Sequence, residues 1–201
     1  MGCHTWFRNK VADMPPEHLE RLRQYHIKGI KNAYIYKCSL GQWLADAEEE
    51  LKDLEEGYSD EAKKSESYKL YRNLAKKSGT KEYYEKHRNQ YKKDLETLQN
   101  PKATRLQLLR VFKRHDLSFE LDRYGKNGSY EMSNVGWHDQ YRVYGYPGVT
   151  HHNAEEAIKF LEEYDNGNNI VCDYKTGMCN EVRDIINNFF KQFPNGTIHY
   201  G

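Results

Sequence analysis

Nine histidines are unevenly spread along the chain. His18, His26, His87 and His115 lie in charged helical sequence, whereas the contexts of His4, His138, His151, His152 and His199 differ. One residue separates His4 from Trp6, and His138 directly follows Trp137. Imidazole gains or loses a proton near neutral pH, so it is the commonest side chain for proton transfer and a frequent metal ligand. We therefore predict a site with four catalytic histidines: His4, His138, His151 and His152.

The segment after the adjacent histidines 151–152 predicts a helix whose first turn can receive an anion. Asn153 is a typical N-cap residue, with Glu156 three positions later. The N–H groups and the positive dipole end of such a helix favour a phosphate, and nearby guanidinium and aromatic side chains suit a base or a sugar. The predicted ligand-binding residues are Trp6, Trp137, Asp139, Arg142, Tyr144 and Asn153.

Several of these residues also have a purely structural interpretation. Trp6 and Trp137 suit the anchoring of a hydrophobic core, and the His-His pair at 151–152 suits a capping segment. Asp139 can order the turn around His138. The sequence does not show whether the histidines meet in space, so both interpretations stay open.

Several signatures of catalysis and of cofactor binding are absent. The sequence has no phosphate-binding Gly-x-x-x-x-Gly-Lys-Ser/Thr loop, no dinucleotide-binding glycine loop, no His-Glu-x-x-His and no Gly-x-Ser-x-Gly. His4 and Thr5 are adjacent, so the His-x-Thr spacing of 2H phosphoesterases is not met. Cys172 and Cys179 flank a short loop but supply only half of a zinc site. We therefore expect no cofactor and no metal ion.

The composition predicts a folded protein of one domain, or one domain with a sizeable insertion. The mean hydropathy of −1.04 is low, but 13% of the 201 residues are aromatic, which disordered chains usually lack. Lys and Arg (31) nearly balance Asp and Glu (30), which argues against duplex DNA as a partner of the whole protein. No apolar run reaches a membrane span of roughly 20 residues, and no secretion or lipidation signal is seen. We therefore expect no membrane partner and a cytoplasmic location.

The two ends of the chain predict strands around a few helices. After a strand at 3–8, a helix begins at Pro15-Pro16 and is expected to stop at Gly29. The C-terminal third predicts a hairpin at 118–132, a helix from Asn153 and another at 181–192. The further strands are expected at 141–144, 170–172 and 197–200.

Residues 40–115 differ in composition from both ends of the chain. They are rich in charged residues, nearly free of Gly and Pro, and their apolar residues recur at helical spacing. Narrow apolar stripes with polar backs predict antiparallel helices packed on one another. We therefore predict an α+β fold with a small, mostly antiparallel sheet and packed helices. Residues 1–39 and 116–201 would form the α+β core domain, and residues 40–115 a long inserted helical arm.

The opening Met-Gly-Cys-His-Thr-Trp-Phe resembles the start of small uncharacterised proteins encoded by bacteriophages, particularly gut phages. Residues 137–147, Trp-His-Asp-Gln-Tyr-Arg-Val-Tyr-Gly-Tyr-Pro, and the acidic helix expected soon after resemble their C-terminal parts. The similarity covers the two ends and leaves out the helical middle, consistent with an insertion. It implies a phage origin and expression in the cytoplasm of a bacterial host, and it transfers no activity.

Two functions from different classes follow from these observations. Phage accessory proteins of this size commonly act on host machinery or host defence, which is an argument by association. In the leading hypothesis, the two chain ends build a His/Trp/Tyr pocket that sequesters or cleaves a nucleotide or another small phosphate-bearing ligand. As an enzyme it would be a histidine-based phosphodiester hydrolase. In the alternative, the helical arm binds a host protein or forms a homodimer, without catalysis.

Overall fold

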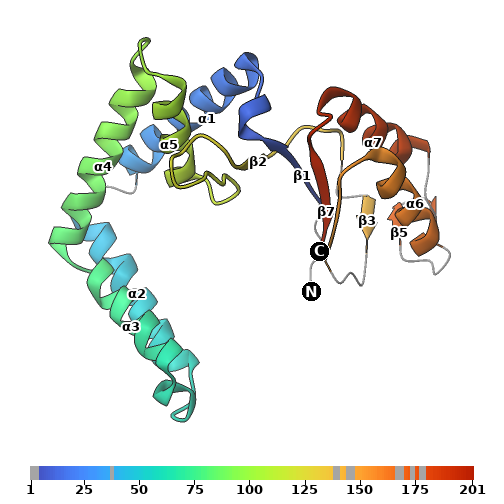
Figure 1. Ribbon diagram of the computed structural model, residues 1–201. Coiled ribbons are helices and arrows are strands. Elements are labelled where there is room, and N and C mark those ends of the chain that lie inside the picture. The colour runs from blue at the N-terminus through green and yellow to red at the C-terminus, as the bar shows by residue number, and fades with distance from the viewer. Residues whose placement is uncertain are drawn as a thin grey trace. The chain divides into compact units, whose positions relative to one another are not determined.

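The computed structural model describes residues 5–36, 39–137, 141–143, 148–165, 170–172, 175–176 and 180–201. Within these residues the chain forms helices and two antiparallel sheets (Figure 1), which agrees with the predicted α+β class. The chain divides into two compact units, one of residues 1–19 and 112–201 and the other of residues 20–111. The second unit thus starts earlier than the helical middle expected at 40–115.

The first unit is built on a four-stranded sheet in which strands from the two ends of the chain are neighbours. The strand order is β2-β1-β7-β4, all antiparallel, and β1 pairs with β7 from Thr5↔Tyr200 to Arg8↔Thr197. The strands are β1 (Thr5–Lys10), β2 (Ser129–Glu131), β4 (Val149–His151) and β7 (Thr197–Tyr200). A second sheet joins β3 (Tyr141–Val143), β5 (Ile170–Cys172) and β6 (Lys175–Thr176).

Two helices, α6 (Ala154–Asp165) and α7 (Asn180–Gln192), cover one face of the four-stranded sheet. Phe189 of α7 meets the ring of Phe7 at a centroid distance of 5.1 Å, and Phe160 of α6 stacks on Tyr200 at 6.0 Å. Because side chains alternate between the two faces of a strand, Phe7, Ile198 and Tyr200 all point to this side and are buried. The core of the first unit therefore lies between the sheet and these two helices.

The predicted hairpin around 118–132 is present, with one regular strand instead of two. Phe119 forms an isolated bridge with Tyr130, and the backbone N–H of Glu120 donates to the carbonyl of Ser129 at 2.7 Å. Gly128 has φ of +133°, and a Cβ there would lie 1.9 Å from the carbonyl oxygen of Glu120. Only glycine fits this position, which explains why the turn signal is strong.

The second unit is helical, as the periodicity of its residues predicts. Its helices are most of α1 (Pro16–Tyr36), then α2 (Leu40–Gly57), α3 (Glu66–Ser78), α4 (Lys81–Gln99) and most of α5 (Arg105–His115). Short 3₁₀ turns, η1 in the first unit and η2 in the second, lie at Val11–Asp13 and Ala62–Lys64. The side chains of Ser39, Ser65 and Thr80 accept hydrogen bonds from backbone N–H groups at the starts of α2, α3 and α4.

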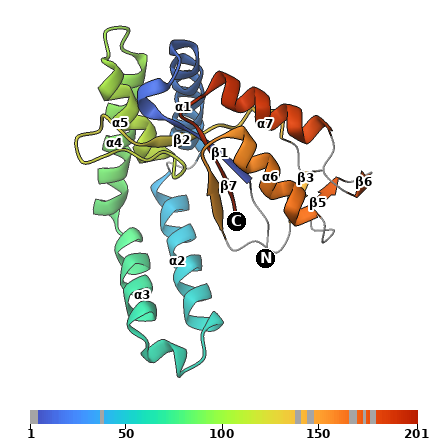
Figure 2. The same ribbon diagram turned by 45° about the vertical axis from the view of Figure 1, so that its right-hand side comes forward.

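Helices α2 and α3 lie side by side and antiparallel in both views (Figures 1 and 2). The indole N–H of Trp43, near the start of α2, donates to the carbonyl of Ser78 at the end of α3 at 2.7 Å. At the other end, the rings of Tyr58 and Tyr68 pack with centroids 5.4 Å apart. We call this pair, residues 40–78, the α2–α3 hairpin.

The expectation that the first helix stops at Gly29 is wrong, because α1 continues to Tyr36. His26 and Ile30 are 4% exposed each, so the buried stripe of the helix runs through the glycine and continues beyond it. A glycine inside a helix weakens it by roughly 1 kcal/mol relative to alanine but does not end it when packing continues.

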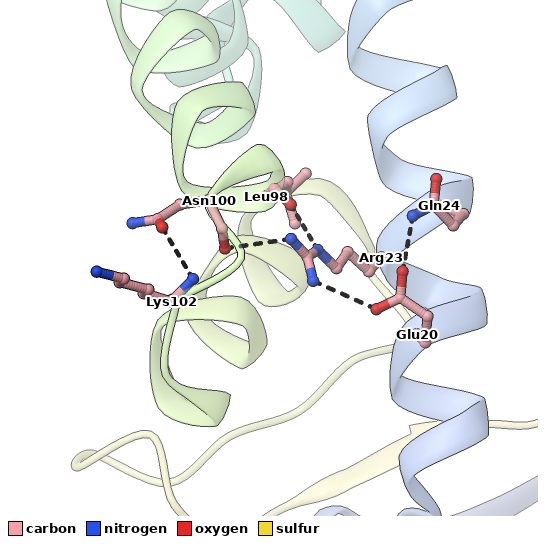
Figure 3. Close-up of polar contacts among 6 residues, drawn as sticks. All are labelled: Glu20, Arg23, Gln24, Leu98, Asn100 and Lys102. Carbon is pink, nitrogen blue, oxygen red and sulfur yellow. Dashed lines mark hydrogen bonds and ion pairs between the residues drawn. The ribbon is translucent and has the colours of Figure 1, made fainter.

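Arg23 joins α1 to the end of α4 within the second unit (Figure 3). Its guanidinium donates from Nε to the carbonyl of Leu98 and from Nη2 to the carbonyl of Asn100 at 3.1 Å, while Glu20 holds Nη1 at 3.3 Å. The last carbonyls of a helix lack partners within the helix, so a cation there satisfies them and interacts favourably with the helix dipole.

Candidate functional site

The open face of the four-stranded sheet carries a cluster of polar and aromatic side chains. On β1, Trp6 and Arg8 alternate with the buried Phe7 and Asn9, and they therefore point away from α6 and α7. Their direct cross-strand partners on β7 are His199 for Trp6 and Thr197 for Arg8. Thr150 of β4 faces His199 from the other side. These five residues, Trp6, Arg8, Thr150, Thr197 and His199, line a shallow hollow of about 210 Å³ that we call the Trp6–His199 pocket.

His199 is held on two sides. Its Nδ1 shares a hydrogen bond of 2.8 Å with the hydroxyl of Thr150, and its ring lies 5.1 Å from the indole of Trp6 at an angle of 35°. A hydrogen bond at one ring nitrogen sets which tautomer the other nitrogen presents. Among the described residues Nε2 of His199 makes no hydrogen bond, so this atom can serve a ligand.

Arg8 supplies the positive charge of the pocket. Its Nη1 lies 3.5 Å from a carboxylate oxygen of Glu120, and its side chain is 34% exposed. Its Nε is buried and has no hydrogen-bond partner among the described residues. A long ion pair to an exposed carboxylate is weak, so the guanidinium keeps donors for a bound anion.

The chemistry of this group is that of an anion site with an aromatic wall. A guanidinium, an imidazole and two hydroxyls can donate hydrogen bonds to phosphate or carboxylate oxygens, and an indole can stack on a flat or apolar part of the same ligand. The hollow is smaller than the roughly 300 Å³ at which pockets for drug-sized ligands begin. Because the hollow is open, it suits the phosphate and one adjoining group of a ligand whose remainder lies outside it.

The predicted histidine His151 lies on the opposite face of the sheet from Trp6. It is 7% exposed and packs on Phe160 at a centroid distance of 4.7 Å and on Tyr200 at 5.7 Å. Burial lowers the pKa of His151 below its ordinary value, while the Glu156 carboxylate opposes this shift and His152 adds to it. Burial thus favours the neutral form of His151. Its side chain packs in the core beneath the sheet and does not reach the face that carries Trp6.

Asn153 and His152 form the start of α6. The side-chain oxygen of Asn153 accepts from the backbone N–H of Glu156 at 2.9 Å, and the carboxylate of Glu156 reaches back to the backbone N–H of His152 at 3.4 Å. This reciprocal arrangement is a capping box. The backbone N–H of Glu156 is thus satisfied by the Asn153 side chain, and that of His152 by the Glu156 carboxylate.

The remaining predicted residues fall into two groups. Trp137 packs on Phe7 at 5.5 Å and on Tyr141 at 5.6 Å, which places it on the core side as an anchor. Four further predicted residues lie outside the described residues: His4, His138, Asp139 and Tyr144. The backbone of Arg142 belongs to β3, but its side chain is also outside what the structure describes. Of the predicted set, the structure places Trp6 in the Trp6–His199 pocket, and sequence reasoning did not select Arg8, Thr150, Thr197 or His199.

Comparison with models of known protein families, with curated proteins and with solved structures finds no match for this chain. Among the described residues, no three or more His, Cys, Asp or Glu side chains are placed to hold a metal ion together. A search of the same residues finds no helix long and apolar enough to cross a membrane. The geometry of the pocket is therefore the basis on which a function is proposed.

Proposed function

We propose that this protein binds a small phosphate-bearing ligand, such as a nucleotide, in the Trp6–His199 pocket. The observation that carries the proposal is the direct cross-strand pairing that gathers Arg8, His199 and Trp6 in one hollow. The exposed part of the Arg8 guanidinium and the fixed imidazole of His199 would hold the phosphate. The indole of Trp6 would pack on the neighbouring sugar or base.

Binding is better supported than cleavage. Hydrolysis by a histidine acid–base pair needs two imidazoles within reach of one ligand, and the described part of the pocket contains His199 alone. His4 stands two residues before Trp6 in the chain and lies outside the described residues. We therefore propose sequestration as the primary activity. Together with the phage origin that the chain ends imply, we further propose that this sequestration counters host defence in the host cytoplasm.

Calorimetric titration of the full-length protein tests this proposal. The probes are inorganic phosphate, nucleoside monophosphates and cyclic dinucleotides. We expect at least one of them to bind below about 1 mM, and Arg8→Met or His199→Gln to weaken that binding at least tenfold, roughly the loss of one charged hydrogen bond.

The matched control is Lys159→Met, which removes one positive charge from the exposed surface of α6 outside the pocket. It should leave the affinity unchanged. Absence of binding by every probe at 1 mM, or equal losses in the pocket and control variants, would contradict the proposal.

A second candidate function is an interaction role for a long inserted helical arm, binding a host protein or a second copy of the chain. The observation that favours it is a set of apolar side chains on α3 that stay more than half exposed, Leu70, Tyr71 and Leu74. Single exposed apolar residues are ordinary, but three within one and a half turns of a helix form a patch that suits a partner.

A further inference from the structure

The two helices of the α2–α3 hairpin carry opposite charge. Helix α2 has seven acidic residues against Lys52, and α3 has four basic residues against Glu66. The acidic residues are Asp46, Glu48, Glu49, Glu50, Asp53, Glu55 and Glu56, and the basic ones are Lys69, Arg72, Lys76 and Lys77. Within the hairpin, Arg72 contacts Glu55 at 2.8 Å. One long side of the hairpin is thus acidic and the other basic.

A partly apolar groove runs between these two charged sides. Its volume is about 660 Å³, and it is lined on α2 by Glu50 and Leu54 and at the end of that helix by Tyr58. On α3 it is lined by Tyr71 and Leu74, which are 54% and 53% exposed. Ala75, Lys77 and Ser78 of α3 and Tyr83 of α4 (Lys81–Gln99) also line it. Leu70, one turn before Leu74 on the same helix, is 58% exposed. Exposed apolar side chains that are flanked by charged residues form a surface that suits a partner.

We propose that the groove face of the α2–α3 hairpin packs on the same face of a second copy of this chain, forming a four-helix bundle. The two-fold axis would run parallel to the helices. This operation places the acidic α2 of one copy over the basic α3 of its partner, and every neighbouring pair of helices is antiparallel. An axis across the helices would instead stack α2 on α2, with acid facing acid. The charge pattern therefore selects both the partner and the orientation.

A second copy fits this face better than an unrelated protein because the face is self-complementary: its acidic side matches the basic side of an identical face. The groove supplies the apolar centre from both copies, while the acidic and basic sides exchange partners across the axis. This inference does not rest on the phosphate pocket, which belongs to the other compact unit.

The size of the face predicts a reversible dimer. Helices of 18 and 13 residues are about 27 and 20 Å long at 1.5 Å per residue. With a helix diameter of about 10 Å, each copy contributes roughly 400–500 Å² in projection, which lies at the low end of specific interfaces. We expect dissociation in the micromolar range and weakening by salt, because surface charges are screened at high ionic strength.

Sedimentation analysis of the full-length protein across about 1–300 µM tests the proposal. We expect a monomer–dimer equilibrium, and Leu74→Glu should raise the dissociation constant at least about 30-fold, because each dimer buries this side chain twice. Leu117→Glu is the matched control, since Leu117 is fully exposed and lies outside the hairpin. A monomer at every concentration, or equal effects of the two variants, would overturn the proposal.

A charge exchange tests the identity of the partner and the orientation together. The variant Glu50→Lys with Asp53→Lys makes α2 less acidic, and Lys76→Glu with Lys77→Glu makes α3 acidic. Each variant alone should dimerise at least tenfold more weakly, and mixing the two should restore the dimer as a heterodimer. Circular dichroism would verify that both remain helical. Failure of the mixture to associate better than either variant alone would contradict the proposed pairing, and with it the second copy as the occupant.

Discussion

His151 and His199 lie on the neighbouring strands β4 and β7 but on opposite faces of the sheet, and their surroundings give them different chemistry. His199 shares a hydrogen bond with Thr150 in an open hollow. His151 is buried against Phe160, and its Nε2 has no hydrogen-bond partner among the described residues. A buried nitrogen without a partner costs stability. His199 is therefore the histidine suited to a ligand, and His151 is one that affects folding.

His151 should make the stability of the first unit depend on pH. Burial lowers its pKa in the folded protein, so the unfolded chain takes up a proton first as the pH falls below the ordinary value of about 6.5. Stability contributed by the neutral form is present above that pH and is lost as the pH falls toward the lowered pKa. We expect urea unfolding to show a loss of stability between pH 7.5 and 5.5.

His151→Leu should flatten this pH dependence and raise the stability at pH 7.5 by about 1 kcal/mol, because it removes a buried polar atom without a partner and keeps a similar volume. His152→Gln removes an exposed neighbour that lowers the pKa of His151 less than burial does, so it should leave most of the slope in place. Equal slopes in the wild type and His151→Leu would show that burial of this imidazole does not control the pH dependence.

At the scale of single elements, the start of α6 depends on side-chain capping. Asn153 accepts from the backbone N–H of Glu156, and hydrogen bonds from Asn153 and from the backbone of His152 lower the pKa of the Glu156 carboxyl. Asn153→Ala should lower the free energy of unfolding by about 1 kcal/mol, as measured by denaturant titration.

Asn187→Ala on α7 provides the comparison, because Asn187 is an exposed residue inside a helix where alanine is the better helix former. It should be neutral or slightly stabilising. A loss at Asn187 as large as that at Asn153 would mean that capping does not explain the effect. Asn153→Ala should also leave the phosphate affinity unchanged, because the residues that line the pocket belong to β1, β4 and β7 and do not include Asn153.

Most helices could be predicted from the sequence because their signals are local. Apolar residues at helical spacing place α2, α3 and α4, and the break at Ser78-Gly79-Thr80 separates α3 from α4 where Thr80 caps the next helix. The expected stop at Gly29 was wrong because it also relied on a local signal. The glycine alone suggests a helix end, whereas the burial of Ile30 shows that the packed stripe of the helix continues past it.

The candidate site could be predicted only in part because strand pairing is not local. Trp6 was selected for its type and its place near a chain end, and it lines the pocket. His199 was seen as a histidine in a strand, but nothing in the sequence tells that β7 lies between β1 and β4. That order decides which side chains become neighbours, so Arg8 and Thr150 had no signal of their own.

At the scale of the whole molecule, the division into two compact units predicts two unfolding transitions. Ile198 on β7 and Leu98 on α4 are both 0% exposed, and each belongs to a different unit. Ile198→Ala should destabilise the first unit and Leu98→Ala the second, each by about 3 kcal/mol. Calorimetry or denaturant unfolding should show each variant moving a different transition.

Trp43 gives a fluorescence signal for the second unit, because the other two tryptophans, Trp6 and Trp137, belong to the first. With Trp6 and Trp137 replaced by phenylalanine, the Trp43 signal should follow the transition that Leu98→Ala moves. One cooperative transition shifted equally by both alanine variants would show that the two units unfold together.

The central position of β7 has a consequence for the order in which the protein folds on the ribosome. Strands β1 and β4 lack a neighbouring strand between them until residues 197–200 have been made, although β1 at residues 5–10 is made long before β7. At roughly 5–20 residues per second, this interval lasts on the order of ten seconds or more. Residues 20–111 can form their helices during that time. The Trp6–His199 pocket therefore forms only when β7 inserts between two strands that were made before it.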